Sequence, residues 1–585
     1  MPIYIQDSSP LPAFFGKVSS TMGAFTANFD GTSGIQPDID GSLNRAMGDF
    51  RCRFIDTDQL FPLLGNYRIG TSNWGDNPDR NGRPDGNGDV NDDERTAIAN
   101  LDFIIINGQQ GRGSGFVAAV DDMLDWRDAN ASHLVIYEYT DIQEAGDSGS
   151  ETANKLSGET GPNGLLDWWV YDDYTAGAGA NKVSSFPGSE HTNLTRYVTP
   201  DAFGEIFPEW YANYVKDNLL THNTPTNVRL HIYNDVTDHR HRAPSSTSPG
   251  RKFDYNGDGV ADNGRNGWQD GGLGQETAEA YREGHRIFFD RLKADTPGLL
   301  INGNTTTWGM ENDDENFVVN WRETPHTFYD QSMNGGLQEN ITIQDKFPVA
   351  GVRSTATGLD IDNFGSWRLA VNQMMASMFW QLEPNHTSMG WSGYIDSSSI
   401  NLSLGGELNP LVGSNILAEN MQVFRWGLCS TLLTNGFFYA QNARRIQNSS
   451  PMLDEFGVIN QSTTGLDGRK WMGAAVDADL ITREFALGAS GRWIGSVDTD
   501  AMFKREFQNA IALVNTNKSV ASSADITITV KVGADEDNGE LESGKWKEIN
   551  GAQDSSVNQG RIINTSNFPG GYTIGGIDGR VLQRT

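Results

Sequence analysis

The sequence predicts an α/β chain, in which a (β/α)8 TIM barrel with long loops precedes a C-terminal antiparallel β-sandwich domain. From about residue 51, short apolar runs that end in polar residues alternate with helical stretches. Near-continuous apolar strands with helical crossovers are typical of a parallel sheet covered on both faces. Six such runs favour the barrel, and a doubly wound open sheet is the alternative. After about residue 480, short strands between Gly, Asn, Asp and Ser turns predict the β domain.

The predicted strands share a β-rich body and a polar end, and they are Arg51–Asp56, Leu101–Asn107, His133–Glu138, Trp168–Asp172, Val228–Asp235 and Leu299–Asn304. Apolar side chains at three- and four-residue steps predict helices over Phe116–Asp128, Glu276–Lys293, Trp367–Leu382 and Ala418–Leu433. A further helix is expected to begin near Thr199, which can act as N-cap with Pro200 in the first turn and Phe203 on the apolar face. The C-terminal strands are expected at Phe507–Val514, Ile526–Val530 and Gly579–Leu582.

These patterns divide the chain into three parts. Residues 1–50 are rich in Ser, Gly and Pro and are expected to form an irregular N-terminal arm. Residues 51–480 carry the barrel pattern, and residues 481–585 carry the C-terminal β domain.

The chain is strongly acidic, with 44 basic and 76 acidic side chains among 585 residues, so that 44 − 76 = −32. Nucleic acid and anionic membranes attract basic surfaces, so this balance argues against both as partners. The 15 Trp and 28 Phe residues exclude a disordered acidic tail, because such segments lack aromatic side chains.

The two cysteines, Cys52 and Cys429, are too few for a disulfide framework or a zinc knuckle, and two buried thiols are expected. No apolar run reaches the length of a membrane helix, and the first residues lack the features of a signal peptide. An extracellular or virion-associated location is favoured over a cytoplasmic one.

Two loops rich in Asp and Asn suggest structural calcium sites. Oxygen ligands on alternate residues with glycine between them let one short loop surround a calcium ion. The second loop matches the opening of an EF-hand pattern, with Gly259 at the sharp turn, but Arg265 stands where that pattern has a bidentate Glu. The candidate ligands are Asp85, Asn87, Asp89, Asn91 and Asp93 in the first loop, and Asp254, Asn256, Asp258 and Asp262 in the second.

Carboxylates gather where the predicted strands end, a position that faces one mouth of a barrel. They are Asp56, Asp58, Glu138, Asp141, Asp172, Asp173 and Asp235, and aromatic residues such as Trp74, Tyr139, Trp168, Tyr174, Trp308, Trp321 and Trp391 lie near strand ends or in the loops. Sugar hydrolysis needs paired carboxyl groups beside flat aromatic faces, because one acid protonates the leaving oxygen while the other attacks or activates water. Dinucleotide, P-loop, serine-elbow and His-Glu-x-x-His motifs are absent from the sequence. His239 and His241 alternate with arginines, which favours a polar loop over a metal site.

The order of several segments resembles that of the loosely characterised glycoside-hydrolase-like TIM-barrel families. The resemblance runs from about Leu101 to the C-terminus. Its matching segments are Ile232–Asp235, Asp254–Asp262, Leu300–Asn304, Met333–Asn340, Thr431–Phe438, Leu453–Phe456, Arg505–Asn515 and Asp578–Leu582.

The resemblance implies glycosidase activity on a polysaccharide or surface glycan, with catalytic carboxylates at Asp235 and Glu339 and a third candidate at Asp172. For substrate binding we expect Glu138, Tyr139, Trp168, Asn304 and Trp308. Asn435 stands where the pattern often has Asp. The alternative is a catalytically silent carbohydrate-binding or virion surface protein, such as a phage tail or adhesion component, since a fold does not fix a function. A calcium-stabilised scaffold is a third reading, and homo-oligomer or virion assembly is compatible with all three.

Overall fold

The computed structural model describes part of the chain, and the statements below concern that part. The described residues are 59–70, 95, 98–107, 114–146, 151–158, 168–171, 182, 184–186, 189–235, 273–304, 333–338, 386, 388–393, 418–442, 454–457, 464–466, 468–477, 492–495, 501–516, 525–551, 556–576 and 578–585. The N-terminal arm, the predicted strand Arg51–Asp56, the predicted helix Trp367–Leu382, Cys52 and both Asp/Asn-rich loops lie outside them.

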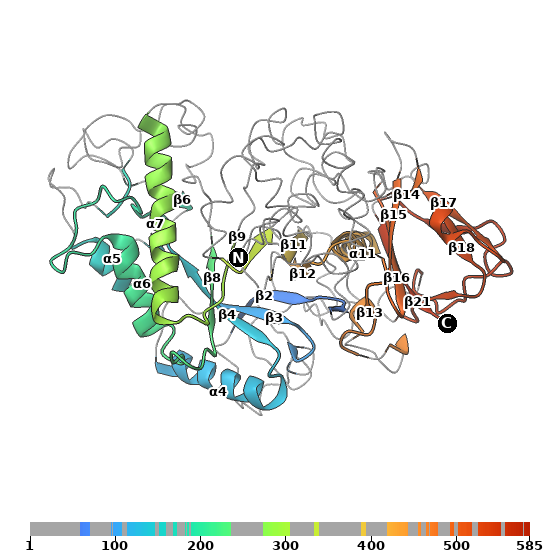
Figure 1. Ribbon diagram of the computed structural model, residues 1–585, viewed down its shortest axis with the longest axis horizontal. Coiled ribbons are helices and arrows are strands. Elements are labelled where there is room, and N and C mark those ends of the chain that lie inside the picture. The colour runs from blue at the N-terminus through green and yellow to red at the C-terminus, as the bar shows by residue number, and fades with distance from the viewer. Residues whose placement is uncertain are drawn as a thin grey trace, which may run out of the picture.

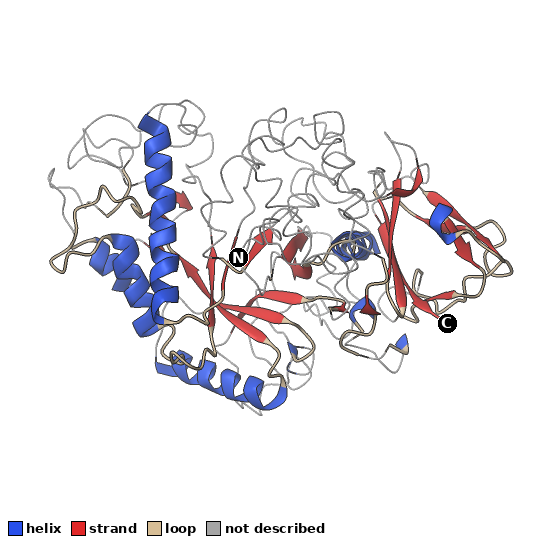
Figure 2. Ribbon diagram, in the orientation of Figure 1, coloured by secondary structure: helices blue, strands red, loops and turns tan. Residues whose placement is uncertain are grey.

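An eight-stranded parallel sheet forms the body of the molecule (Figures 1 and 2). In spatial order its strands are β12 (Phe437–Asn442), β11 (Ser388–Gly393), β10 (Gly335–Gln338), β9 (Ile301–Asn304), β8 (His231–Asp235), β4 (Val135–Asp141), β3 (Phe103–Asn107) and β2 (Gly65–Gly70). The two edges of the sheet meet, because Leu64 forms a parallel bridge with Phe438 and the Phe438 N–H donates to Leu63 O at 2.9 Å. The predicted parallel α/β architecture is therefore confirmed as a curled sheet.

Helices connect these strands, and three of them lie where the sequence places them. They are α4 (Ser114–Asn130) between β3 and β4, α7 (Leu273–Asp295) between β8 and β9, and α11 (Ala418–Leu432) before β12. A short helix, α5 (Glu151–Leu156), and α6 (Phe207–Asn218) lie in the long connection from β4 to β8. In α4, Val120, Met123, Leu124 and Arg127 recur at three- and four-residue steps and are all buried.

Helix α6 begins later than predicted. The Asp201 carboxylate accepts the N–H groups of Phe203 (2.8 Å) and Glu205 (3.0 Å), and Gly204 takes a left-handed conformation with φ of 83°. These contacts stabilise a turn over the residues expected to be helical. The helix starts only where the Glu209 carboxylate accepts the Ile206 N–H at 3.1 Å, so Thr199 is not the N-cap and Phe203 is 87 % exposed.

The predicted strand Trp168–Asp172 does not belong to the parallel sheet. Trp169 bridges Thr192 and Tyr171 bridges Lys182, both in the antiparallel sense. This segment lies beside a small antiparallel sheet made of β5 (Glu144–Gly146), β7 (Ser189–His191) and β6 (Ser184–Phe186). Its four described residues, 168–171, are all buried, and Trp168 packs against Phe207 and Trp210 of α6. This burial accounts for the strand-like composition of the run.

The C-terminal strands form two sheets. The larger is antiparallel, in the order β14 (Arg492–Gly495), β15 (Ala501–Glu506), β16 (Ala510–Asn515), β21 (Asp578–Arg584) and β19 (Trp546–Glu548). The smaller contains β18 (Glu540–Glu542), β17 (Ile526–Lys531) and β20 (Tyr572–Ile574). The expectation of purely antiparallel pairing is wrong at one place, because β17 and β18 are parallel.

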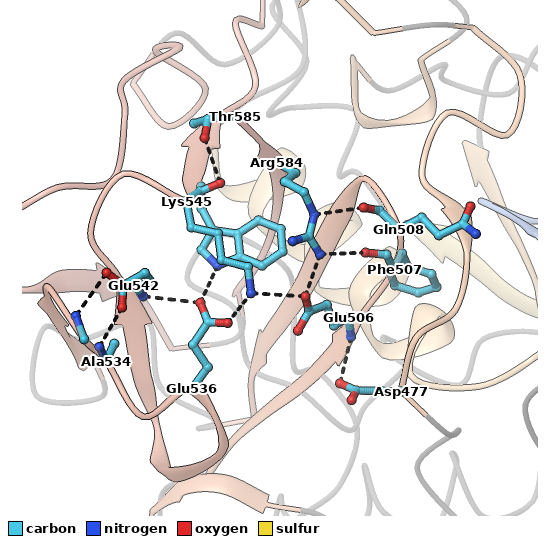
Figure 3. Close-up of polar contacts among 12 residues, drawn as sticks. Asp477, Glu506, Phe507, Gln508, Ala534, Glu536, Glu542, Lys545, Arg584 and Thr585 are labelled. Atoms are coloured by element: carbon cyan, nitrogen blue, oxygen red, sulfur yellow. Dashed lines mark hydrogen bonds and ion pairs between the residues drawn. The ribbon is translucent and has the colours of Figure 1, made fainter.

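An ion network ties these strands together (Figure 3). The Glu506 carboxylate accepts from Arg584 Nη2 at 2.6 Å and from Lys545 Nζ at 3.2 Å, and Lys545 also pairs with Glu536. The ring of the buried Trp546 lies 4.8 Å from both Lys545 Nζ and Arg584 Cζ, in cation–π contact with each.

A layer of rings fills the inside of the curled sheet at the amino ends of its strands, and we call it the inner layer. It comprises Phe103, Tyr137, His231, His386 and Phe437. Tyr137 Oη and His386 Nδ1 are hydrogen-bonded at 2.8 Å, although β4 and β11 are separated by three strands in the sheet. Such a contact requires the sheet to curl with this face inward.

Two glycines make room for the inner layer. A Cβ atom on Gly65 would lie 2.2 Å from the ring of Phe103, and a Cβ atom on Gly335 would lie 2.9 Å from the His386 carbonyl. A larger residue would therefore displace the Phe103 ring at position 65 and the His386 backbone at position 335.

Of the described residues, no helix is both long enough and apolar enough to cross a bilayer. Cys429 is a buried free thiol, as predicted.

His231 is expected to make stability sensitive to acid. Burial, and then the charges of His386 and Arg127, lower its pKa from 6.5 to about 3, while its Nδ1 accepts the Leu300 N–H at 3.0 Å. The stability contributed by the neutral, buried His231 is fully present above pH 6.5. It is lost as pH falls towards 3, because in that range the unfolded chain binds a proton at this histidine and the folded chain does not. Between pH 6.5 and 4, the free energy of unfolding should fall with pH less steeply for His231→Gln than for the wild type. The two slopes should differ by about 1.4 kcal/mol per pH unit.

Denaturant unfolding at a series of pH values measures both slopes. The comparison variant is His133→Gln: burial and the charge of Arg469 also lower the pKa of His133, but by less than that of His231, so its replacement should change the slope less. Equal slopes for wild type and His231→Gln would contradict a neutral buried His231.

Candidate active site

The carboxyl ends of β4 and β8 bring two aspartates side by side. Asp141 and Asp235 are the last residues of these neighbouring strands and are register partners. Side chains alternate along a strand, so Asp141 shares a face with Tyr137 and Asp235 shares a face with His231. Since Tyr137 and His231 belong to the inner layer, both carboxyl groups lie on the inner face, at the end opposite that layer.

Asp235 is held by a tyrosine from the adjacent strand. Tyr139 Oη donates to Asp235 Oδ2 at 2.5 Å, and only 9 % of Asp235 is exposed. The Tyr139 ring stacks on Tyr233, with 6.0 Å between centroids and 27° between planes. The sequence prediction placed Tyr139 near the substrate, and the structure places it against the predicted catalytic Asp235.

Asp141 experiences a different environment. Its Oδ1 accepts the N–H groups of Gln143 (2.9 Å) and Glu144 (3.1 Å), which fixes the turn after β4. Burial raises the pKa of Asp141 well above its usual range, and the nearby charges of Glu144 and Asp235 raise it further. These effects outweigh the two backbone N–H groups, which favour the ionised form. A carboxyl group with a raised pKa therefore lies beside Asp235.

The outer face of the same strands supports this pair. Asn234 Oδ1 accepts Thr140 Oγ1 and the Ile142 N–H, both at 3.2 Å, and Asn234 Nδ2 donates to Asp235 O at 3.0 Å. The Thr192 N–H donates to Gln143 O at 2.9 Å, and Gln143 Nε2 lies 3.2 Å from His285 Nε2 of α7. The turn that carries Asp141 is thus fastened to β8, to the strand β7 region and to α7.

Two predicted substrate-binding residues lie elsewhere. Glu138 is fully buried and is in register with Ile106 and Ile232, on the face opposite Tyr139 and Asp141. Trp168 is fully buried against Phe207, and its Nε1 donates to Thr199 O at 2.9 Å. Neither side chain lies with Asp235 on the inner face.

The other predicted site residues are described only in part. Asn304 ends β9, at the same edge of the sheet as Asp235. Glu339 directly follows the last residue of β10, but it lies outside the described residues, as do Asp172, Trp308 and all nine predicted calcium ligands. Tyr171, the residue before Asp172, pairs with Lys182 and not with the parallel sheet, and the role of Asp172 stays a prediction. Within the described residues, no group of three or more His, Cys, Asp or Glu side chains could hold a metal ion.

Asp141 is the residue whose importance the sequence did not single out. It was one of seven strand-end carboxylates, and the only available signal was its place two residues after Tyr139. Asp141 and Glu138 lie on opposite faces of β4, and only the inner layer shows which of these two faces points inward.

Comparisons with known proteins give remote structural likenesses. Amy13B of Eubacterium rectale is 9 % identical, with 90 % of this chain and 97 % of that chain covered and a TM-score of 0.41. A β-galactosidase from Bacillus circulans sp. alkalophilus is 10 % identical over 90 % and 100 % of the chains, with a TM-score of 0.34. A glycoside hydrolase family 5 protein from Bacteroides vulgatus is 9 % identical over 90 % and 89 %, with a TM-score of 0.30.

The structural neighbours thus include glycoside hydrolases, at similarities that do not decide the activity of this chain. No protein-family model and no curated protein sequence matches it.

Because the pKa of Asp141 is raised in the folded state, this residue is expected to destabilise the fold at neutral pH. A folded-state pKa above the unfolded value means that stability falls as pH rises from about 4 towards neutrality. Asn at this position cannot ionise and can still accept the two backbone N–H groups. Asp141→Asn should therefore raise the melting temperature at pH 7 and leave it nearly unchanged at pH 3.5.

Thermal unfolding at the two pH values tests this, with the exposed Asp217→Asn on α6 as the matched control. A lower melting temperature of Asp141→Asn at pH 7 would show that the ionised carboxylate stabilises the fold.

Proposed function

We propose that this protein is a glycoside hydrolase whose catalytic carboxyl groups lie at the carboxyl ends of the curled parallel sheet. The observation that carries the proposal is the pair Asp141 and Asp235, two adjacent carboxyl groups in different environments: burial raises the pKa of Asp141, and Asp235 accepts a hydrogen bond from Tyr139. Two adjacent carboxyl groups in unlike environments are what acid-base hydrolysis of a glycosidic bond uses.

In this proposal Asp235 acts as nucleophile or base, and a second carboxyl group protonates the leaving oxygen. Glu339 is one candidate for the acid, because β10 ends one residue before it at the same edge of the sheet. Asp141 is the other candidate, supported by its raised pKa. The substrate is a polysaccharide or a surface glycan, and Asn304 and Trp308 are proposed to contact it.

The architecture that would carry this site is a full (β/α)8 barrel over residues 51–480, with a C-terminal β-sandwich over 481–585. The Leu64–Phe438 bridge between the two edge strands supports closure of the barrel. Ile511 of β16 and Ile528 of β17 share one apolar cluster, which supports face-to-face packing of the two C-terminal sheets.

The decisive experiment is a panel of polysaccharides and surface glycans, scored for both binding and the release of reducing ends. The wild type is expected to release reducing ends from at least one glycan, and Asp235→Asn should lower that rate at least 1,000-fold, because it removes a charge that the transition state needs. Asp217→Asn, on the exposed side of α6, is the matched control and should retain the wild-type rate.

Glu339→Gln and Asp141→Asn in the same assay decide which group is the acid, because only loss of the acid is relieved by substrates with a good leaving group. Binding without release of reducing ends would replace the hydrolase with a catalytically silent carbohydrate-binding protein, of the kind found on virion surfaces. Full activity of Asp235→Asn would overturn the assignment of the site.

We further propose, from the sequence pattern of the two Asp/Asn-rich loops, that calcium stabilises the fold. Excess EDTA should lower the melting temperature by several degrees, and added Ca²⁺, but not Mg²⁺, should restore it, because loops of this kind offer seven or so flexible oxygen ligands. Asp258→Asn should weaken the response to Ca²⁺. A melting temperature indifferent to EDTA would remove calcium from the account.

A further inference from the structure

The contact between Tyr139 and Asp235 differs from the other contacts of the carboxyl pair. It joins two strands, it places a neutral O–H donor 2.5 Å from a carboxylate oxygen, and it lies on the inner face of the sheet. The comparable contacts of Asp141 are to backbone N–H groups within its own turn. The phenol therefore acts on one member of the pair only.

Because it rests on the proposed hydrolase activity, the following inference deepens that function. We propose that Tyr139 is a positioning residue, which fixes the orientation of the Asp235 carboxylate for catalysis through the hydrogen bond from its hydroxyl group to Asp235 Oδ2.

The geometry makes Tyr139 a rigid donor. Its backbone is paired with Tyr233 in the β4–β8 register, and its ring stacks on the Tyr233 ring. Thr140, the next residue, is held from the opposite face by Asn234 Oδ1 at 3.2 Å. With both faces of the strand restrained, the hydroxyl group does not need to reorganise when charge moves on Asp235.

The electrostatic surroundings explain why such a donor is needed. Among the described residues, Asp235 faces Tyr139 and Asp141 from β4 and neighbours Tyr233 on its own strand, with Glu144 of β5 beyond Asp141. When acidic groups lie this close together, their mutual repulsion favours protonation of the carboxyl group whose negative charge is not stabilised by a hydrogen-bond donor. A hydrogen bond from Tyr139 stabilises the charged form of Asp235 and not that of Asp141. Tyr139 keeps its own proton throughout and transfers none.

The test is Tyr139→Phe, which removes one oxygen atom and keeps the ring stack. On a glycan that the wild type cleaves, kcat should fall on the order of 10- to 100-fold, the value of one hydrogen bond to a charged group, with KM changed less than twofold. Tyr214→Phe on α6 deletes the same atom far from the pair and should leave both constants unchanged.

A second readout is independent of catalysis. Infrared difference spectra of protein labelled with ¹³C-carboxyl aspartate, wild type minus Asp235→Asn, isolate the carboxylate stretch of Asp235. That band should shift in the Tyr139→Phe background and remain in place in the Tyr214→Phe background, while melting temperatures confirm that all variants are folded.

The outcomes separate this inference from the proposed function. A wild type that cleaves no glycan removes the hydrolase proposal, and the infrared band still decides whether Tyr139 positions the Asp235 carboxylate. Cleavage with an unchanged band and unchanged kcat in Tyr139→Phe overturns the positioning role and leaves the hydrolase standing. A raised KM with unchanged kcat also overturns it, because Tyr139 would then bind substrate directly.

Discussion

The rest of the structure depends on the curl of the parallel sheet, and the hydrogen bond between Tyr137 and His386 shows which face of the sheet points inward. It spans the inside of the sheet from β4 to His386, two residues before β11, and it exists only because the sheet curls back on itself. The neighbouring rings of Phe103 and Phe437, with centroids 5.5 Å apart, fill the same space. Once this layer fixes which face of each strand points inward, side-chain alternation determines the rest. It sends Asp141 and Asp235 inward at the far end and sends Glu138 to the helix-covered face.

A second constraint joins the parallel sheet to the C-terminal strands (Figure 1). Helix α11 packs so closely on β21 that a Cβ atom on Gly579 would lie 2.5 Å from Arg425 O. The Arg425 guanidinium is buried there against the Asp578 carboxylate at 3.0 Å, and Arg580 pairs with the same carboxylate. A buried charge must be compensated, so loss of either partner is expected to cost more than the pair contributes. The five-stranded sheet consequently has two buried faces, one on α11 and one on the small sheet.

These two constraints explain which elements could be predicted from the sequence. The strand β17 has one exposed face and alternates strictly, and β3 and β8 are buried on both faces and read as continuous runs that end in a polar residue. Composition alone could not separate β8 from the run Trp168–Tyr171, because that segment is as completely buried outside the parallel sheet as β8 is within it. The start of α6 was misplaced for a related reason. Thr199 and Pro200 have the chemistry of a helix start, but the Asp201 carboxylate satisfies the following N–H groups in a turn before the helix begins.

The sequence predicts where in the fold the candidate site lies, but not which residues form it. It shows that carboxylates gather at strand ends. Which of them form the site depends on the face of the sheet that each side chain occupies and on contacts between strands. Asp141 and Asp235 are 94 positions apart, and only the β4–β8 register makes them neighbours. Two acidic groups in register oppose each other electrostatically, and a chain selected for stability alone has no reason to keep them together. A local conflict of this kind, supported on both sides by Asn234, Thr140 and Gln143, is what a functional site is expected to contain.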